Sequence, residues 1–108
     1  MSSKKILIIR DNTNTKNSNW LFCFFLKDVN KYQDRDKFLV ELNNEGIEGR
    51  NLFYPLNLMK VYKRFCKKED FPNAENFSKK GVCLPTSYKL NEYDVKRICR
   101  SINSILNK

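Results

Sequence analysis

The amino-acid sequence predicts an α+β domain in which helices pack against a small sheet of about three or four strands. Seven consecutive apolar residues, Trp20–Leu26, have the length of a strand that is covered on both faces. A helix is expected between this strand and the next one, and the last sixteen residues before Asn107 have the strongest helix signal in the chain. A chain that alternates strands and helices in this way has to bury sheet and helix faces against each other.

The N-terminal part is expected to hold one strand and a polar linker. Ile6–Ile9 is a short run rich in β-branched residues, which favours a strand. Asp11–Ser18 is rich in Asn, Thr and Ser, which is typical of a loop. We therefore expect a single domain over residues 1–108, with a strand and linker at 1–18. Its first five residues, Met1–Lys5, are typical of the start of a complete chain.

A helix is expected from Asp34, a residue type favoured at the N-cap, to about Glu45. Gly46 follows at the position where a left-handed C-cap is needed. A short strand, Ile47–Arg50, is expected next, because the helix has just ended and a β-branched residue restarts the chain. The apolar residues of this helix share one face: Phe38, Leu39 and Leu42.

A second helix is expected after Pro55, because apolar residues recur there at the helical spacing i, i+3, i+4, i+7. These residues are Leu58, Val61, Tyr62 and Phe65. Basic residues crowd its other side and its end: Lys60, Lys63, Arg64, Lys67 and Lys68. A third, short helix is expected to begin at Pro72, with Ala74 and Phe77 facing inward.

The C-terminal part is expected to hold a strand, Val82–Leu84, which the following proline ends, and then the best-signalled helix. Asn91 is its predicted N-cap, with Asp94 as the reciprocal acidic partner of a capping box. Leu90 is placed to form a hydrophobic staple with Val95 in the first turn. The predicted apolar face consists of Val95, Ile98, Cys99, Ile102, Ile105 and Leu106.

The chain is basic, with 21 Lys and Arg against 12 Asp and Glu and a formal charge of +9. Such a charge permits binding to nucleic acid or another polyanion. The basic residues are scattered along the chain rather than grouped in blocks, which favours a solvated surface instead. Nucleic-acid binding would have to use the basic residues at 60–68 together with Lys96, Arg97 and Arg100.

Several classes of site are excluded by composition. The chain has no histidine, so it lacks the commonest general base and metal ligand and cannot form a Ser-His or Cys-His pair. No two of its four cysteines stand within four residues of each other, so no Cys-x-x-Cys metal or redox motif exists. No apolar run has the length of a signal peptide or of a membrane span. We therefore expect a reduced, cytoplasmic location, with no metal site and no membrane partner.

The segment from Gly46 to Tyr62 is the strongest candidate for a binding site, because it combines an arginine with aromatic residues, a proline and an amide. Arg50 and the aromatic rings that follow it, on a loop past a strand, could hold a ring and a phosphate. The alternative is that Phe53 and Tyr54 fill the core, which is the commoner role of aromatic residues.

Residues in this segment resemble those of a known family. The resemblance is to the C-terminal region of the DegT/DnrJ/EryC1 aminotransferases. The loop Arg50–Asn57 is similar to the Arg-x-x-Phe-x-Pro-Leu-His loop of that family, and Gly46-Ile47 is similar to its Gly-Ile turn. Earlier in the chain, Arg35-Asp36 with the following helix is similar to its Arg-Asp helix. These enzymes act on keto sugars that are carried by a nucleotide. Asn19–Phe22 resembles the aromatic strand of that family.

The rest of the resemblance lies towards the C-terminus, at Phe71–Glu75, at Leu84-Pro85 and from Leu90 through the closing helix. The similar region runs from about Trp20 to Leu106, and the order and spacing of its parts are specific. The resemblance implies the small domain of a fold-type I aminotransferase. There are two departures: Asn57 stands where the family often has His, and Lys60 stands where it often has Pro.

The resemblance also implies a substrate site and a partner. Arg50, Tyr54 and Asn57 are expected to face the nucleotide sugar, with Arg50 pairing with a phosphate or orienting the loop. In the family, pyridoxal phosphate, its Schiff-base lysine and its phosphate cradle belong to a large domain, and this chain contains none of these. We therefore expect no catalytic or cofactor-binding residue here and no activity of the chain alone.

Three interpretations remain open at this stage. The chain could be a fragment or a subunit that pairs with a separate large PLP-binding domain, or a vestige of such an enzyme. It could be a basic nucleic-acid-binding module. It could also be an interaction domain, including a homodimer, because a small domain by itself exposes the apolar face that normally meets the large domain.

Overall fold

The computed structural model describes residues 4–67 and 70–108. The expectation that Met1–Lys5 begins a complete chain therefore falls largely outside the described residues. Lys68, one of the basic residues of the second predicted helix, also lies outside them. No helix among the described residues is long and apolar enough to span a membrane.

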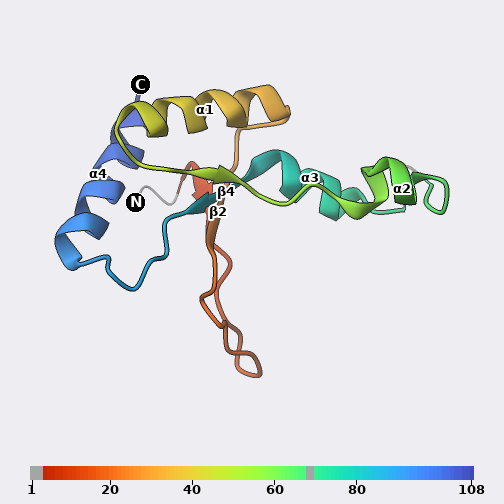
Figure 1. Cartoon of the computed structure of the whole chain (residues 1–108), viewed down its shortest axis with the longest axis horizontal. Helices are drawn as coiled ribbons and strands as arrows, with labels where there is room; N and C mark the ends of the chain where they lie inside the picture. The colour runs from red at the N-terminus through yellow and green to blue at the C-terminus, as the bar shows by residue number, and fades with distance from the viewer. Residues whose placement is uncertain (1–3, 68–69) are drawn as a thin grey trace.

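The centre of the fold is a four-stranded antiparallel sheet with the strand order β1-β2-β4-β3 (Figure 1). The strands are β1 (Ile6–Leu7), β2 (Phe22–Leu26), β3 (Arg50–Asn51) and β4 (Gly81–Leu84). β2 pairs with β4 in the register Phe24 to Val82, and β1 and β3 flank this central pair. The predicted α+β class is confirmed, with the larger of the two expected strand numbers.

The hydrophobic core lies between one face of this sheet and two helices, α1 (Tyr32–Asn44) and α4 (Glu92–Leu106). Side chains on a strand alternate between the two faces, so Phe24 and its partner Val82 point to the same side. Both are fully buried, as are Leu42 from α1 and Ile102 from α4. The apolar residues of these strands and helices are therefore buried against one another in a single core.

Helix α1 begins earlier than predicted and ends as predicted. Its N-cap is Lys31, which makes no side-chain cap, and Asp34 stands in the first turn, so the prediction of Asp34 as N-cap is wrong. An acidic residue in the first turn still favours the helix through its dipole. At the other end Gly46 has φ 75°, and its N–H donates to Asn43 O while Ile47 N–H donates to Leu42 O. This Schellman motif confirms the predicted glycine cap.

Helix α4 has the predicted N-terminus. The Asn91 side chain accepts a bond of 2.9 Å from the backbone N–H of Asp94, and the Asp94 carboxylate accepts one of 3.1 Å from the N–H of Asn91. The capping box is therefore confirmed. Ile98, Ile102 and Ile105 are buried, whereas Val95 remains half exposed.

The other strands differ in extent from the prediction. β1 ends at Leu7 rather than Ile9, and the strand predicted at Ile47–Arg50 begins only at Arg50. The expectation that all of Trp20–Leu26 is covered on both faces is wrong in its first part, since Trp20 is 71% exposed. Strand pairing stops where β4 stops, and β4 has only four residues to pair with β2.

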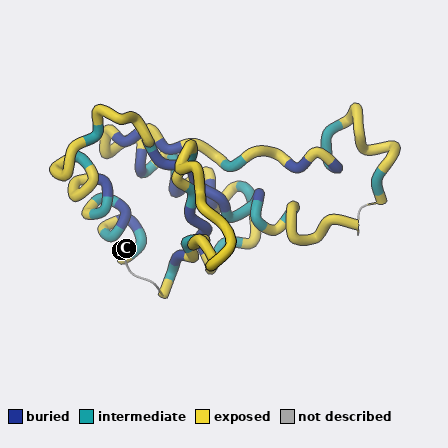
Figure 2. Tube along the Cα trace, turned by 90° about the horizontal axis from the view of Figure 1, so that it is seen from below, coloured by how far each residue is buried: buried dark blue, intermediate teal, exposed yellow. Residues whose placement is uncertain are grey.

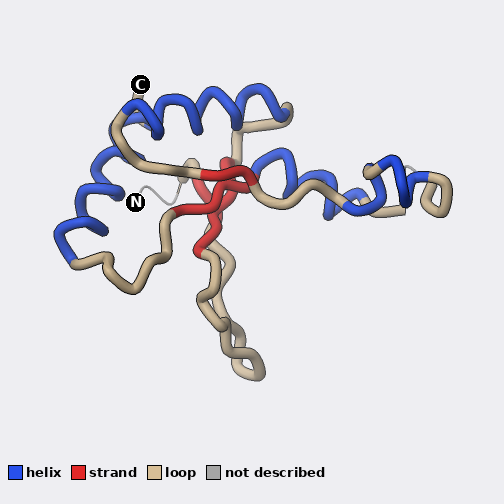
Figure 3. Tube along the Cα trace, in the orientation of Figure 1, coloured by secondary structure: helices blue, strands red, loops and turns tan. Residues whose placement is uncertain are grey.

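Two arms extend away from the core (Figures 1 and 3). One is the polar loop between β1 and β2, which has the irregular structure that its composition predicted. The other includes η1 (Leu56–Leu58), a 3-10 turn, α2 (Lys60–Lys63) and α3 (Pro72–Lys80). The radius of gyration is 15.2 Å, against about 13 Å for a compact chain of this length.

The second arm is mostly exposed (Figure 2). Val61 and Phe65 are 70% and 73% exposed, and α2 has no buried residue. Ala74 is exposed as well, whereas Phe77 is half-buried against Phe25 with ring centroids 4.7 Å apart. The helix predicted from the stripe at 58–65 is limited to Lys60–Lys63, because Leu58 belongs to η1 and Phe65 lies beyond the end of α2.

Candidate functional site

The segment that follows β3 connects the sheet to the second arm, and it contains the three predicted substrate residues. Arg50 is exposed at the end of the sheet, where Glu48 accepts hydrogen bonds from its Nη2 at 2.7 Å and its Nε at 3.1 Å. The hydrogen bond and the charge of Glu48 raise the pKa of Arg50. Arg50 is therefore a fixed cation with an accessible guanidinium, a group suited to phosphate or carboxylate.

Tyr54 is 48% exposed and is steadied from α1 rather than buried in the core. Its ring lies 6.1 Å from the ring of Tyr32, and the guanidinium of Arg35 lies 5.4 Å from the centre of the Tyr32 ring. Phe53 is 68% exposed. The alternative in which Phe53 and Tyr54 fill the core is therefore wrong.

Asn57 is buried, with 7% of its surface exposed, and its amide nitrogen donates to Glu75 Oε1 at 3.0 Å. This bond joins η1 to α3. It uses one of the two N–H groups of the side chain, and the carbonyl oxygen of the same amide provides an acceptor.

Asn57 also lines an apolar cavity of about 440 Å³ in the second arm. The other lining residues come from η1, α2 and α3 and from the turn between them: Leu56, Tyr62, Phe65, Cys66, Phe71 and Ala74. No lysine lines this cavity, so the described residues here do not fit a cofactor that is held as a Schiff base. The cavity is suited to an apolar side chain or the edge of a ring.

The structure does not bring the three predicted residues into one pocket. Arg50 lines a different, open cavity of about 280 Å³ together with Cys83, Thr86 and Ser87. Tyr54 is not among the residues that line either cavity. The three residues are thus distributed along one segment, 50–57, and do not line a common cavity.

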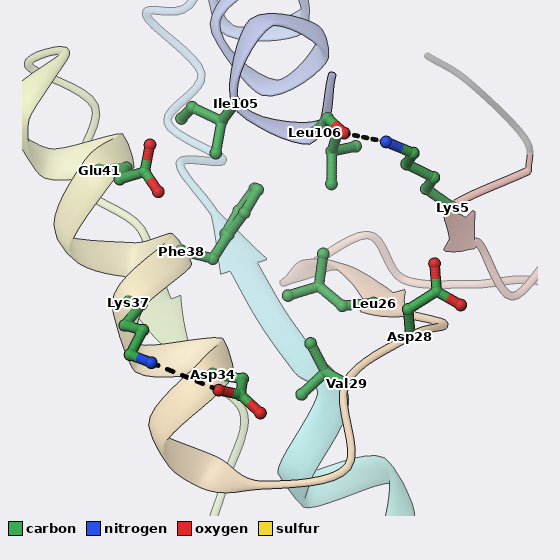
Figure 4. A pocket seen from close by; sticks show the side chains of 10 residues that line it. All are labelled: Lys5, Leu26, Asp28, Val29, Asp34, Lys37, Phe38, Glu41, Ile105 and Leu106. Carbon is green, nitrogen blue, oxygen red and sulfur yellow. Dashed lines mark hydrogen bonds and ion pairs between the residues drawn. The ribbon is translucent and has the colours of Figure 1, made fainter. Parts of the chain in front are cut away.

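A third cavity, of about 270 Å³, lies between α1, the last two residues of α4, the end of β2 and Lys5, which precedes β1 (Figure 4). It is lined by both acidic and basic side chains, and some of these are already paired. Lys37 Nζ lies 3.7 Å from Asp34 Oδ1, Lys108 forms an ion pair of 2.6 Å with Glu41, and Lys5 donates to Leu106 O. Because these polar groups already pair with one another and join the C-terminal end to α1 and to Lys5, the cavity is not a candidate site.

The exposed apolar side chains of the second arm form what we term the arm surface: Phe53, Leu56, Val61, Tyr62, Phe65 and Phe71. Trp20 adds to it through a ring contact with Phe53 at 6.3 Å. The whole chain exposes 8383 Å², whereas a compact monomer of this mass exposes roughly 6,300 Å². This difference exceeds the about 800 Å² that a standard-size interface buries on each partner, and the exposed polar loop between β1 and β2 contributes to it.

The basic residues do not form a continuous face among the described parts of the chain. Lys60 and Lys63 lie on α2, at one end of the molecule, whereas Lys96 and Arg97 lie on α4, at the other end (Figure 1). Lys96 forms an ion pair of 2.7 Å with Glu92, and Arg97 donates to Glu45 O. The surface expected for nucleic-acid binding is therefore divided.

Sequence reasoning missed the residues that position the candidate site. Arg35 is 4% exposed and donates from Nη1 to the carbonyl of Ser78 at 2.7 Å and from Nε to Asp36 at 2.9 Å. Tyr32 and Glu75 hold Tyr54 and Asn57 in place. The one available signal was the Arg-Asp pair within the family-like motif, since nothing in its spacing shows that this arginine is buried.

The chain is similar to known proteins in sequence, which shows the family, and in structure, which shows the fold. The model of the DegT/DnrJ/EryC1/StrS aminotransferase family matches residues 2–103. The chain is 32% identical over 98 residues to a GDP-perosamine synthase of Vibrio cholerae, covering 91% of this chain and 26% of that protein. A GDP-perosamine synthase of Caulobacter vibrioides is 32% identical over 72 residues, covering 67% and 19%.

Among solved structures, the fold is similar to part of Spr1654 of Streptococcus pneumoniae, described as a sugar aminotransferase, in its PMP form. The TM-score is 0.85 at 22% identity, with 98% of this chain and 27% of that chain covered. PseC of Helicobacter pylori, an aminotransferase involved in pseudoaminic acid biosynthesis, gives 0.70 at 20% identity, covering 81% and 23%. The chain thus spans about a quarter of the length of the proteins it matches. It belongs to the DegT/DnrJ/EryC1/StrS aminotransferase family.

Proposed function

We propose that this chain is the small domain of a pyridoxal-phosphate-dependent aminotransferase that acts on a nucleotide-linked keto sugar. It closes the active-site cleft and contributes side chains to the substrate pocket. A large PLP-binding domain, on another chain or another part of a longer one, supplies the catalytic residues. The chain alone is inactive in this proposal, and its location is cytoplasmic.

The observation that supports this most directly is the arm surface. Val61 on α2 is 70% exposed, and Phe65, just beyond the end of that helix, is 73% exposed. Soluble monomers rarely leave a large contiguous apolar patch uncovered. A large domain that covers this face would explain both the exposed stripe and the excess surface of the chain.

The substrate residues follow from the same arrangement. Arg50 offers its guanidinium beside an open cavity, where a phosphate of the nucleotide can accept two hydrogen bonds. Tyr54 offers the exposed side of its ring and its hydroxyl to the sugar. Asn57, whose amide nitrogen binds Glu75, offers its carbonyl oxygen at the wall of the apolar cavity.

The cofactor belongs to the partner in this proposal. Bound PLP acts as the electron sink of amino transfer, and it needs a lysine within a shaped pocket. The described lysines lie on the surface or at charged contacts, such as that of Lys37 with Asp34. This chain's own residues would bind and orient the substrate and exclude water from the closed cleft.

The proposal can be tested by reconstitution. The chain is mixed with a Vibrio cholerae GDP-perosamine synthase that has been truncated to remove the matching C-terminal quarter. We expect a complex in analytical ultracentrifugation, PLP absorbance that stays with the complex, and amino transfer to a nucleotide keto sugar above that of either part. The isolated chain is expected to show no turnover and to lose PLP on dialysis.

Variants separate docking from substrate contact. Arg50→Gln should lower turnover of the complex without weakening its assembly, whereas Phe65→Glu on the arm surface should weaken assembly. Lys79→Gln on α3 serves as a matched control for the loss of a charge. Turnover by the isolated chain would overturn the proposal. A chain that binds no large domain of the family and also stays monomeric at high concentration would overturn it as well.

A further inference from the structure

Two cysteines face each other across the central strands. Cys23 of β2 and Cys83 of β4 are direct partners in the antiparallel register, and their Sγ atoms are 3.1 Å apart. Both are free thiols in the structure. Side chains of directly opposite residues lie on the same face of a sheet, so the strand register brings the two thiols together.

The backbone geometry suits a covalent link. Directly opposite residues of an antiparallel pair have Cα atoms about 4.5 or 5.5 Å apart, depending on whether they are hydrogen-bonded. Disulfides span Cα separations of about 4.4 to 6.8 Å. Both kinds of opposite pair therefore lie within the disulfide range, and a bond between these two sulfur atoms requires little movement of the strands.

The pair lies on the sheet face that α1 and α4 leave uncovered. Phe24 and Val82 point into the core, so their neighbours Cys23 and Cys83 point to the opposite side. Cys23 is half-buried and lines an open cavity of about 280 Å³ next to Arg10. Cys83 lines the adjoining cavity that contains Arg50. A small oxidant can therefore approach the pair from solvent at Cys23, whereas Cys83 is only 8% exposed.

We propose that Cys23 and Cys83 form a reversible cross-strand disulfide when the chain meets a small-molecule disulfide such as oxidised glutathione. One thiolate attacks a sulfur of the oxidant, the oxidant's S–S bond breaks, and one glutathione thiolate leaves. The second cysteine attacks the protein sulfur of this mixed disulfide, and the second glutathione leaves. The two protons of the cysteines end on the two glutathione thiols, which have gained two electrons.

The rate of this reaction at neutral pH is limited by the thiolate. Burial, with the hydrogen bond and the charge of Cys83, raises the pKa of Cys23 to about 12. Cys23 therefore keeps its proton at neutral pH, and oxidation requires long incubation there. The inference does not depend on the proposed function, because it concerns only the sheet.

The experiment is oxidation of the 108-residue chain in a large excess of oxidised glutathione, followed by acid quenching, alkylation and mass spectrometry. We expect two of the four thiols to be protected from alkylation and a peptide that joins Cys23 to Cys83. Dithiothreitol should restore all four thiols. The oxidised chain should melt roughly 10 °C higher, because the link closes a loop between residues 60 positions apart.

Matched variants make the result specific. Cys23→Ser and Cys83→Ala should each abolish the linked peptide and the rise in Tm, whereas Cys66→Ser and Cys99→Ser should keep both. Circular dichroism of each reduced variant checks that the fold is retained. Four alkylatable thiols after prolonged oxidation, a stable glutathione adduct without the link, or a link to Cys66 or Cys99 would each overturn the proposal.

Discussion

The side-chain amide of Asn57 donates a hydrogen bond of 3.0 Å to the carboxylate of Glu75, and this bond connects the 3-10 turn to helix α3. Sequence comparison within the family-like motif drew attention to Asn57 as a replacement for histidine. The structure gives it a positional role, because it fixes the loop that contains Tyr54 relative to α3.

The first prediction concerns this bond. Asn57→Asp places a carboxylate against Glu75 and should increase hydrogen exchange in residues 55–63, since two like charges repel where one bond stood. The cost of the lost charged bond is about 1.5 to 3 kcal/mol of local stability. Asn57→His restores a donor and should cost less. Equal exchange in Asn57→Asp and the unaltered chain would show that the bond does not fix the loop.

The second prediction concerns the buried guanidinium of Arg35. Arg35→Ala should lower the free energy of unfolding by about 3 kcal/mol in urea denaturation, because Ser78 O loses a buried donor and a cavity is left. Arg35→Lys should lose less. Lys37→Ala, two residues along the same helix and exposed, is the control and should change the free energy by under about 0.5 kcal/mol. A similar loss in both alanine variants would contradict this assignment.

The third prediction tests the cap of α4. Asn91→Ala should lower the free energy of unfolding by about 1 kcal/mol, because the backbone N–H of Asp94 loses its acceptor. Glu92→Ala at the next position removes an exposed ion pair with Lys96 and one acidic side chain of the first turn, and should cost about 0.5 kcal/mol. Thermal denaturation followed by circular dichroism measures both, and the reverse order of effects would show that the capping box contributes little.

The fourth prediction follows from the pKa of Cys23, which is raised from its ordinary value of 9.0 to about 12. The folded chain therefore keeps this proton between about pH 9 and 12, while the unfolded chain loses it. The contribution of the Cys23 thiol to the free energy of unfolding is therefore fully present below pH 9, and it declines as the pH rises from 9 to 12. Under reducing conditions, Cys23→Ser should therefore lose less stability between pH 7 and 10 than the unaltered chain. Parallel pH curves for the two would contradict the raised pKa.

The fifth prediction concerns the arm surface of the isolated chain. It should self-associate at high concentration, because Phe65 and Val61 are more than two-thirds exposed. Phe65→Glu should reduce the association measured by sedimentation velocity and leave Tm unchanged, since this ring contacts little of the core. Tyr88→Glu, a 92% exposed aromatic outside the arm surface, is the control and should leave the association intact.

The sequence by itself determined the elements whose signals are local. The glycine cap at Gly46 and the capping box at Asn91 depend on residues within one or two turns, so they could be predicted with their partners. The α+β class and the family followed from periodicity and from motifs that stand in order along the chain. Arg50, Tyr54 and Asn57 were identified as substrate residues from the same motifs, and that role stays a prediction.

Only the tertiary structure decided which apolar faces are covered. The stripe at 58–65 has the spacing of a core helix, yet it lies on an arm beyond the sheet and is largely exposed. Its spacing could not predict this exposure, because burial depends on what packs against a segment. The contacts of Cys23 with Cys83 and of Arg35 with Ser78 join residues 60 and 43 positions apart. Such pairs are set by strand register and helix packing, which no local pattern in the sequence encodes.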